Sequence, residues 1–438
     1  MLIVMEKEAS DEDILGVVAK IEALGYVAQP IPGGERTAIG ILRNPGPVDP
    51  ALFVDLPGVQ EAIPVSRPYK LVSREMKRAD TIVELPGGVK IGGKSYKIEV
   101  IERDDETKPD VALRRVNELV QDNKVNALVG GTFAHISLAM NGQSKKDKFF
   151  LMTTNGVPDS YFTKVEKGPY SLCVLGDNGM VGRGAAAYVV DNLKAKNVVF
   201  FMPDYAYGRF AYGGAEAVLK ARPGVKYNVV WSPVGTADLT SFLIKSLEFQ
   251  PEFICMGHWG NDAINALKQA HEMGLKKKTK LFFNWIIDVM AAGIPPEALE
   301  GIWCQMWWYH NLEGFKDADV VKAAKEFTDR YMKAYGEPPD PYGMTAYDGA
   351  METLRAMEIA NSLDPAKMYA ALMANPDFKS AKGPAKWRID GRPQYKYNSW
   401  IVEGKGPADR KHPKWDYAKI IDVYAGDAFL PTVKEMGW

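Results

Sequence analysis

The sequence predicts an α/β protein with doubly wound parallel sheets, preceded by a small α+β domain. From about residue 97 onward, short apolar runs that suit buried strands alternate with segments of helical periodicity. This alternation is typical of parallel sheets with helices on both faces. Before that point, strands and helices follow one another at a spacing that fits a much smaller module. A chain of 438 residues is also too long for one core, so we expect two or three domains.

The composition is that of a globular protein without a strongly charged partner. Hydrophobic residues make up 46% and charged residues 25%, and the net charge is −1. We therefore expect neither nucleic acid nor an anionic membrane surface as a partner. The 3 cysteines lie in apolar runs and form no CxxC pair, and the histidines show no HExxH spacing. Buried free thiols, no metal site and no cofactor are the prediction.

No segment of the sequence resembles a membrane anchor or an export signal. Only a few apolar residues precede the charges at the N-terminus, which is too short for a signal peptide or a transmembrane helix. We expect no direct insertion into a membrane.

The small domain is predicted to have a βαββαβ-like, ferredoxin-like order. Ser10 is followed by three acidic residues, as a helix start prefers, and apolar residues then recur at helical spacing up to Gly25. Its expected elements are a strand at Leu2–Met5, a helix from Ser10 to Gly25, a strand at Thr37–Leu42, a short helix at Pro50–Leu56 and a strand at Val59–Val65.

The larger part is predicted to repeat the order strand, helix, strand. The expected strands are Lys97–Glu102, Ala127–Val129, Phe149–Met152, Asn197–Met202, Lys226–Trp231, Phe253–Met256 and Lys280–Asn284. The expected helices are Asp110–Val120, one after Thr132, Gly179–Leu193, Gly213–Ala221, Leu239–Phe249 and Ala263–Met273.

The segment Asn126–Ala139 is the first candidate for a ligand site. Its apolar strand ends at Gly130 and Gly131, and Thr132 precedes the helix. Backbone N–H groups at such a helix start have no intrahelical partner, and they suit an anion such as a carboxylate. An ordinary strand-to-helix turn is the alternative, and Ser137 could face the turn or point away from it.

A second strand end strengthens this prediction. Phe149–Met152 leads into Thr153 and Thr154, which are again small and polar. Ligands of open α/β sheets bind beyond the carboxyl ends of strands, so we expect both segments to face one cleft.

Two regions resemble known families. The segments GERTAIGI (Gly34–Ile41), RPYKLVSRE (Arg67–Glu75) and DTIVELPGGVKIGG (Asp80–Gly93) resemble the N-terminal regulatory domain of one class of 3-deoxy-7-phosphoheptulonate (DAHP) synthase. In that family the domain precedes a catalytic TIM barrel and mediates feedback by aromatic amino acids. The GPCS-type and Lys-Pro-Arg-Thr motifs of the barrel are absent downstream, so we do not expect the enzyme activity.

From Gly87 to the C-terminus the chain resembles a type I periplasmic solute-binding protein of the branched-chain amino acid and amide importers. The matching segments are IGGKSYKIEVIERDDETKPDVA, VNALVGGTFAHISLA, PDYAYGRFAYGGAE, DLTSFLIKSLEFQPEFICMG and PYGMTAYDGAMETLRAM. The family's first strand–helix unit is not found, and the two resemblances meet at Gly87–Gly93, which indicates a fusion.

The resemblance implies a two-lobed domain. The small domain would span 1–75 and a junction 76–94, where limited proteolysis is expected to cut. Lobe one would comprise 95–176 and about 302–383, and lobe two 177–301 and about 384–438.

The resemblance also implies the ligand-binding residues. Lobe one would contribute Gly131, Thr132, Thr153 and Thr154, and lobe two Tyr207, His258 or Trp259, and Trp285, with no catalytic residue. Either Trp307 or Trp308 could stack on the ligand, and core packing is an equal alternative for both.

The implied function is that of the substrate-binding component of an ABC importer. The ligand would be a branched-chain amino acid, an amide or a similar small solute, and the importer permease would be the partner if the chain is exported. The family is periplasmic, whereas the chain as written has no signal peptide and would stay in the cytoplasm. The alternatives are a DAHP synthase-related enzyme and a cytosolic amino-acid sensor that acts through the small domain.

Overall fold

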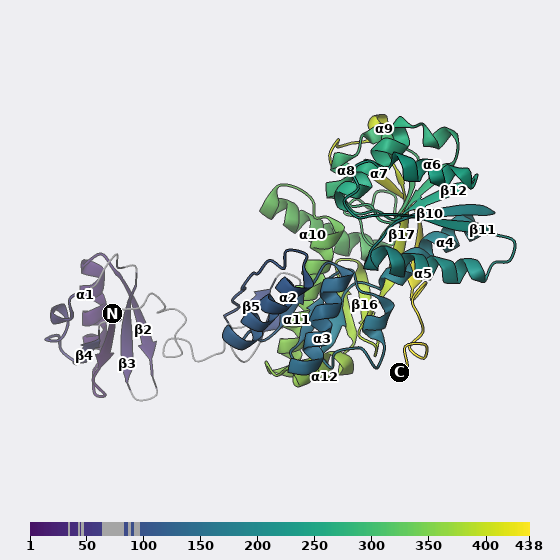
Figure 1. Cartoon of the computed structure of the whole chain (residues 1–438). Helices are drawn as coiled ribbons and strands as arrows, with labels where there is room; N and C mark the ends of the chain where they lie inside the picture. The colour runs from purple at the N-terminus through teal and green to yellow at the C-terminus, as the bar shows by residue number, and fades with distance from the viewer. Residues whose placement is uncertain (34–35, 43, 45–47, 64–82, 86–88, 92–96) are drawn as a thin grey trace. The chain divides into compact units, whose positions relative to one another are not determined.

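The computed structural model describes residues 1–33, 36–42, 44, 48–63, 83–85, 89–91 and 97–438. These residues form two compact units, Met1–Glu99 and Val100–Trp438 (Figure 1). The segment Arg67–Glu75, most of the predicted proteolytic junction 76–94 and most of Asp80–Gly93 lie outside the described residues. The described residues of this stretch are the strands β5 (Val83–Leu85) and β6 (Val89–Ile91), which pair antiparallel.

The small unit contains the predicted ferredoxin-like arrangement. Its antiparallel sheet has the order β2-β3-β1-β4, and helix α1 (Asp11–Ala23) starts at Ser10, whose hydroxyl accepts a hydrogen bond from the N–H of Asp13. The predicted helix at Pro50–Leu56 is only a 3₁₀ turn, Pro50–Leu52. The strands are β1 (Leu2–Met5), β2 (Val27–Pro32), β3 (Thr37–Leu42) and β4 (Val59–Ile63).

Strand β2 was not expected from the sequence. It contains Pro30 and Pro32, which cannot donate to a ladder and argue against a central strand. The structure places β2 at the edge of the sheet, where a proline is tolerated. Beneath the sheet, apolar side chains such as Ile3, Ile21 and Phe53 form a core that belongs to this unit alone.

The larger unit is built on a nine-stranded sheet. The first five strands run parallel in the order β11-β10-β12-β13-β14, and β17 continues the sheet antiparallel to β14. The parallel strands are β10 (Asn197–Pro203), β11 (Lys226–Ser232), β12 (Phe253–Met256), β13 (Lys280–Phe283) and β14 (Trp303–Met306). The others are β15 (Asp377–Ser380), β16 (Gly383–Trp387), β17 (Pro393–Gly404) and β18 (Ala418–Gly426).

Helices cover both faces of the parallel strands, as predicted for a doubly wound sheet. Figure 1 shows α4 and α5 on one face and α6 and α7 on the other. Their bounds are α4 (Asn178–Ala187), α5 (Ala206–Lys220), α6 (Thr240–Glu248) and α7 (Gly260–Glu272), and the short helices α8 (Asp288–Gly293) and α9 (Pro296–Leu299) follow β13.

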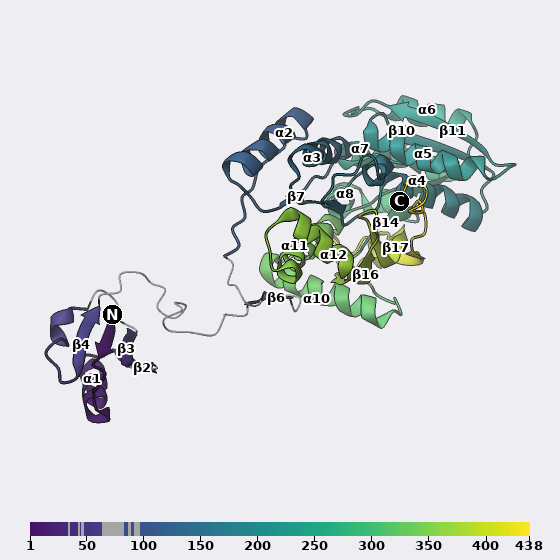
Figure 2. The same cartoon turned by 90° about the horizontal axis from the view of Figure 1, so that it is seen from below.

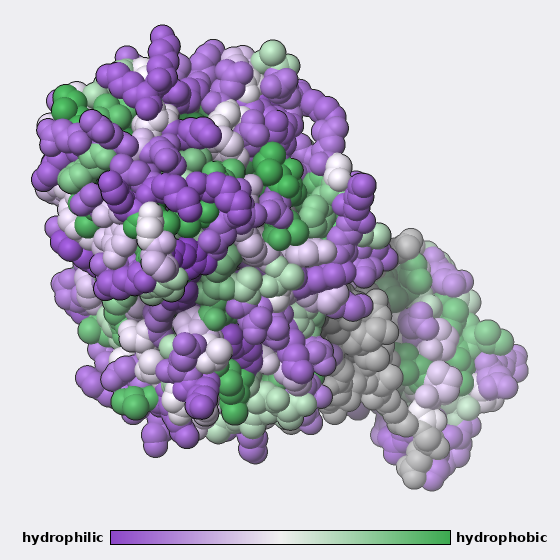
Figure 3. Space-filling model, turned by 90° about the vertical axis from the view of Figure 1, so that its right-hand side faces the viewer, coloured by the Kyte–Doolittle hydropathy of each residue, from purple (hydrophilic) through white to green (hydrophobic). Residues whose placement is uncertain are grey.

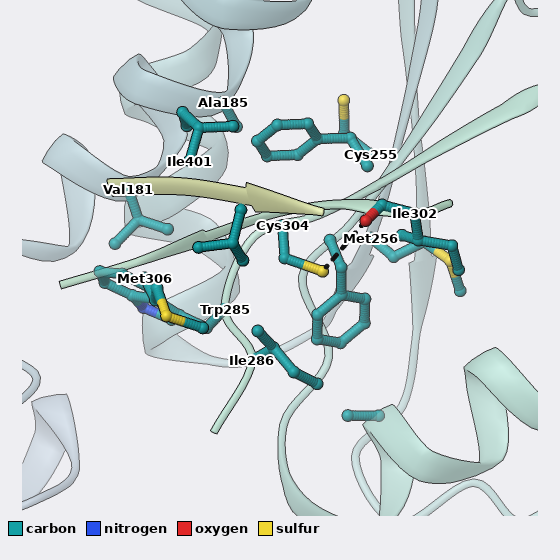
Figure 4. Packing of buried hydrophobic residues seen from close by; sticks show 14 of the residues in the cluster. Val181, Ala185, Cys255, Met256, Trp285, Ile286, Ile302, Cys304, Met306 and Ile401 are labelled. Atoms are coloured by element: carbon teal, nitrogen blue, oxygen red, sulfur yellow. Dashed lines mark hydrogen bonds between the residues drawn. The ribbon is translucent and has the colours of Figure 1, made fainter. Parts of the chain in front are cut away.

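The central strands β10, β12 and β13 are nearly continuous apolar runs because both of their faces are buried. Figure 4 shows Cys304 of β14 within this packing, with Met306 and Ile401 near it. The thiol of Cys304 lies 3.8 Å from the carbonyl oxygen of Ile302. The three cysteines are buried free thiols, as expected.

A second, three-stranded parallel sheet has the order β7-β8-β9. Its strands are β7 (Leu128–Gly130), β8 (Leu151–Thr153) and β9 (Ser171–Cys173). The helices beside it are α2 (Pro109–Asn117), α3 (Ala134–Asp147), α11 (Pro341–Ala360) and α12 (Pro365–Ala374), and α10 (Ala318–Tyr335) precedes α11. Figure 2 shows α2 next to α3, and α11 next to α12.

The run FFLM alternates between two cores on the faces of this sheet. Phe149 and Leu151 pack with side chains of α2 and α3, whereas Phe150 and Met152 pack with those of α11 and α12. Burial on both sides explains why the run has no polar position.

One predicted strand does not form. Lys97–Glu102 has no regular structure, and its Ile98 and Val100 side chains are 47% and 77% exposed. An alternating segment becomes a strand only where a neighbour accepts its backbone hydrogen bonds. Among the described strands, β7 pairs with β8 alone, so the strand that would link Lys97–Glu102 to this sheet is not found.

The surface of the larger unit is largely hydrophilic. Figure 3 shows charged and polar side chains over most of the visible face, with hydrophobic residues in small groups between them. None of the described helices combines the length and the apolar character needed to cross a bilayer.

Candidate functional site

Five helices of the larger unit begin at one cavity of about 440 Å³, its open mouth included. The helices are α3, α4, α5, α7 and α11, and each contributes its first residues or the residue before them. This is the edge at which sheets of this type collect ligands. The cavity is lined by Thr132, Phe133, Ala134, Gly156, Leu175, Asn178, Tyr205, Tyr207, Trp259, Trp285, Trp307 and Tyr342.

The turn after β7 shapes one side of the cavity. Gly130 and Gly131 have φ of 148° and 85°, a region that favours glycine. Gly156, from the turn after β8, lies so close that a Cβ there would be 2.5 Å from the carbonyl oxygen of Thr132. The two turns can approach only because this position has no side chain.

Helix α4 places an amide in the cavity. The Asp177 carboxylate caps the helix by accepting a 2.7 Å hydrogen bond from the N–H of Met180, and Asn178 follows as the first helical residue. Asp177 also pairs with Arg183 and with the fully buried Arg392. Asn178 is 4% exposed, and its Nδ2 has no hydrogen-bond partner among the described residues.

A chain of rings forms the opposite wall. Trp259 meets Tyr342, Tyr342 meets Trp307, and Trp307 meets Trp285. The interplanar angles are 78°, 79° and 85°, so each contact is edge to face. The indole N–H of Trp307 donates to the carbonyl oxygen of Pro341 at 3.0 Å, which fixes the central ring of the wall.

The start of helix α5 adds two tyrosines. Tyr205 is the residue before the helix, and the ring centroids of Tyr205 and Tyr207 lie 5.8 Å apart. The hydroxyl of Tyr207 is buried and has no partner among the described residues. Burial raises the pKa of Tyr207 well above its ordinary value, so the hydroxyl keeps its proton and can donate it in a hydrogen bond.

A second cavity, of about 500 Å³ with its open mouth included, adjoins the first and shares Phe133, Tyr205 and Trp259 with it. Its further lining residues are Thr107, His135, Pro203, Val234 and Asp262. His135 Nε2 lies 3.1 Å from the carbonyl oxygen of Thr107, and Asp262 accepts a hydrogen bond from the N–H of Gly235.

Electrostatically, the first cavity favours an anion. Helices α3, α5 and α7 are preceded by Phe133, Tyr205 and Trp259, and none of the three has a side-chain hydrogen bond at its cap. Their positive dipole ends are therefore not neutralised by a capping carboxylate. Of the described residues that line this cavity, none is an aspartate or glutamate.

Four of the eight ligand-binding residues expected from the sequence line this cavity. They are Thr132, Tyr207, Trp259 and Trp285. The structure also distinguishes Trp307 from Trp308. Trp307 lines the cavity, whereas Trp308 is a core residue whose indole N–H donates to the carbonyl oxygen of Ala381.

The other four expected residues are not part of the cavity lining. Gly131 faces Ser137 and Met140 of α3. Thr153 is fully buried and donates to the carbonyl oxygen of Leu172. Thr154 is 5% exposed, and its methyl group faces Gly349 of α11.

His258 is the fourth of these residues and belongs to the core under β11 and β12. It is 1% exposed, and its Nε2 lies 2.9 Å from Ser232 Oγ. Burial lowers the pKa of His258 to about 3, so this imidazole is neutral. The residue after a strand points inward or toward the cavity depending on the strand's pleat, and the sequence did not distinguish His258 from Trp259.

Three important lining residues were not predicted. Asn178 and Tyr342 follow the capping residues Asp177 and Asp340, and Tyr205 directly precedes α5. A search for polar or aromatic residues next to each helix start would have found all three. Among the described residues, no cluster of His, Cys, Asp and Glu could hold a metal ion.

Two helix-covered sheets with their strand ends at one cavity are the arrangement of a protein that binds a small ligand. The chain belongs to the periplasmic binding protein family, whose model matches residues 78–408. It is a type I member of the branched-chain amino acid group, with a DAHP synthase ferredoxin-like domain matched at residues 1–67.

Individual relatives agree with this division. The Leu/Ile/Val-binding protein of Escherichia coli is 24% identical over 306 residues, covering 68% of this chain and 78% of that protein. A phospho-2-dehydro-3-deoxyheptonate aldolase of Thermotoga maritima is 38% identical over 98 residues. This chain spans only 29% of the aldolase, which corresponds to the regulatory domain.

Solved structures show the same fold. A periplasmic binding protein from Burkholderia mallei is 25% identical with a TM-score of 0.69, covering 77% of this chain and 86% of that chain. A solute-binding protein from R. palustris in complex with benzoate is 20% identical with a TM-score of 0.63, covering 74% and 84%. LivJ from Streptococcus pneumoniae, in complex with isoleucine, is 19% identical with a TM-score of 0.62, covering 74% and 87%.

Proposed function

We propose that the larger unit is the substrate-binding component of an ABC importer and binds a small carboxylate between its two sheets. The observation that supports this most is the convergence of α3, α5 and α7 on one cavity without side-chain caps. Backbone N–H groups at such helix starts are ready donors for a carboxylate, and the helix dipoles add to the attraction.

The similar structures support a carboxylate in general terms. Isoleucine and benzoate, the ligands named for two of them, share a carboxylate and differ in everything else. In this chain the turn at Thr132–Ala134 would hold that group, and the aromatic wall would contact the apolar part. Hinged closure of the two sheets around the ligand would exclude water, and no chemical step is involved.

Calorimetry with matched ligand pairs tests the proposal. Each carboxylate, such as isoleucine or benzoate, is compared with the alcohol of the same skeleton, isoleucinol or benzyl alcohol. At least one carboxylate is expected to bind, and its alcohol to bind about tenfold more weakly or worse, since charge-assisted hydrogen bonds contribute about 1.5–3 kcal/mol. Equal affinity within a pair, or no binding by any carboxylate, would overturn the proposal.

A further inference from the structure

The side chains that line the cavity indicate what the rest of the ligand is, beyond its carboxylate. Seven of the twelve lining residues are aromatic: Phe133, Tyr205, Tyr207, Trp259, Trp285, Trp307 and Tyr342. Resting on the function proposed above, we infer that the ligand is an aromatic carboxylic acid without an ammonium group.

The aromatic wall fits a flat ring. Its rings meet edge to face at angles of 78° to 85°, so it combines ring faces with ring edges, the two surfaces against which another aromatic ring packs well. The rings are held by one another and by the hydrogen bond from Trp307 to the carbonyl oxygen of Pro341. The wall therefore has little freedom to move closer and contact a thinner aliphatic chain.

The cavity has no partner for an ammonium group. None of its described lining residues is acidic. The acids next to the lining already have partners. Asp177 accepts from the N–H of Met180 and pairs with Arg183 and Arg392. Asp204, beside Tyr205, pairs with Arg209, and Asp262, in the first turn of α7, accepts from the N–H of Gly235. An α-ammonium buried here would lack a counter-charge, and such a group is costly to desolvate.

Aromatic rings can also surround a quaternary ammonium ion, so a betaine is the competing ligand. The positive ends of α3, α5 and α7 argue against it, because they would repel a fixed cation in the same cavity. A ligand whose only charge is its carboxylate meets no such repulsion.

Two buried polar atoms are available to such an acid. Nδ2 of Asn178 is a donor and Oη of Tyr207 is a donor and an acceptor, and neither has a partner among the described residues. Both residues line the cavity, and together they suit a carboxylate oxygen or a hydroxyl substituent on the ring.

The test is calorimetry with five ligands: benzoate, phenylacetate, phenylglycine, leucine and glycine betaine. Phenylglycine is phenylacetate with one added ammonium group, so this pair isolates the charge. We expect benzoate or phenylacetate to bind at least tenfold more tightly than phenylglycine, leucine and betaine. Binding of leucine, phenylglycine or betaine as tight as that of the aromatic acids would overturn the inference and leave the proposed carboxylate function standing. Failure of all five would overturn both.

Two variants connect the result to the cavity. Tyr207→Phe removes a hydroxyl that has no partner among the described residues, so it should fold normally and bind a hydroxylated acid such as 4-hydroxybenzoate or its parent acid at least fivefold more weakly. Tyr212→Phe, on the same helix but outside the lining, is the matched control and should leave affinity unchanged.

Asn178→Asp adds a negative charge at a helix start, where it is tolerated. It should weaken binding of the aromatic acid tenfold or more and reduce the difference in affinity between the aromatic acid and phenylglycine. Unchanged affinities in both Tyr207→Phe and Asn178→Asp, with normal melting, would overturn the inference.

Discussion

Trp285 and Trp307 meet edge to face with their ring centroids 4.2 Å apart, and this pair forms the end of the aromatic wall. We predict that Trp285→Phe weakens binding of the ligand about fivefold to tenfold, because the smaller ring gives up contact area worth about 1 kcal/mol. Trp308→Phe, in the core, should reduce the melting temperature without changing affinity. Calorimetry and thermal melting of both variants check this, and equal losses of affinity would contradict it.

The buried charges behind the cavity are predicted to be essential for stability. Arg392 is fully buried and pairs with Asp177 and Asp390. Arg392→Met removes one of the two arginine partners of each buried carboxylate and leaves Asp177 with Arg183 and Asp390 with Arg388. The free energy of unfolding should therefore fall by about 3 kcal/mol, the lower end of the range for a broken buried pair.

Urea unfolding measures this loss, and an exposed ion pair provides the control. Lys325 and Asp329 form an exposed i,i+4 pair, and Lys325→Met should change the free energy of unfolding by about 0.5 kcal/mol or less. A loss for Arg392→Met as small as that of Lys325→Met would show that the buried charges contribute little.

The close contact between α4 and α5 depends on Gly182. A Cβ at this position would lie 1.6 Å from the carbonyl oxygen of Ala211, so Gly182→Ala must push the helices apart. We expect it to lower the free energy of unfolding by about 3 kcal/mol, at the upper end of overpacking effects.

Gly213, on α5, provides the matched control, because a Cβ added there would meet no neighbouring atom within 4 Å. Gly213→Ala should therefore stabilise the helix by about 0.5–1 kcal/mol. Chemical denaturation of both variants tests the pair of predictions, and a neutral Gly182→Ala would be inconsistent with the observed helix packing.

His258 should make stability depend on pH. Its folded-state pKa is lowered to about 3 by burial, whereas an unfolded histidine titrates near pH 6.5. Between these values the unfolded chain binds a proton that the folded chain does not. The contribution of His258 to the free energy of unfolding should therefore fall as the pH drops below about 6.5, by up to ~1.4 kcal/mol per pH unit, and this contribution should stay constant above that pH.

His258→Gln removes the titrating group and keeps a side chain that can reach Ser232. Its free energy of unfolding should depend less on pH between about pH 4.5 and 6.5 than that of the unsubstituted protein. Parallel urea titrations measure the two slopes, and identical slopes would rule out His258 as the source.

The chain is predicted to have no DAHP synthase activity. The DAHP synthase ferredoxin-like domain model matches residues 1–67, and the alignment with the aldolase spans 98 residues, 29% of that enzyme. The motifs of the catalytic barrel do not follow. Purified protein incubated with phosphoenolpyruvate and erythrose 4-phosphate should form no product above a blank without protein. Product formation that depends on the protein would disprove this prediction.

The sequence was sufficient for the fold because the apolar runs and helical periods are local signals. The strands at Phe253–Met256 and Thr37–Leu42 were predicted with their observed bounds. Lys97–Glu102 failed because its alternation says nothing about whether a neighbouring strand exists. Strand β2 was missed because only tertiary structure shows that it lies at an edge.

The site was predicted less completely. Thr132, Tyr207, Trp259 and Trp285, which the family resemblance implied, line the candidate cavity. Thr153, Thr154 and His258 lie at strand ends, but their side chains are buried in the core. Whether a side chain faces a cavity or a core depends on contacts between distant segments, and the sequence pattern does not record them.

The aromatic wall gives the protein an optical reporter of its own. Of its 10 tryptophans, three line the cavity: Trp259, Trp285 and Trp307. A ligand that enters displaces water from the partly exposed Trp259 and lies close to the buried Trp285 and Trp307. The surroundings of these indoles change, so occupancy should alter the intrinsic fluorescence of the unlabelled protein. Excitation of tryptophan would then allow binding to be followed in real time and association rates to be measured by rapid mixing, with no dye attached.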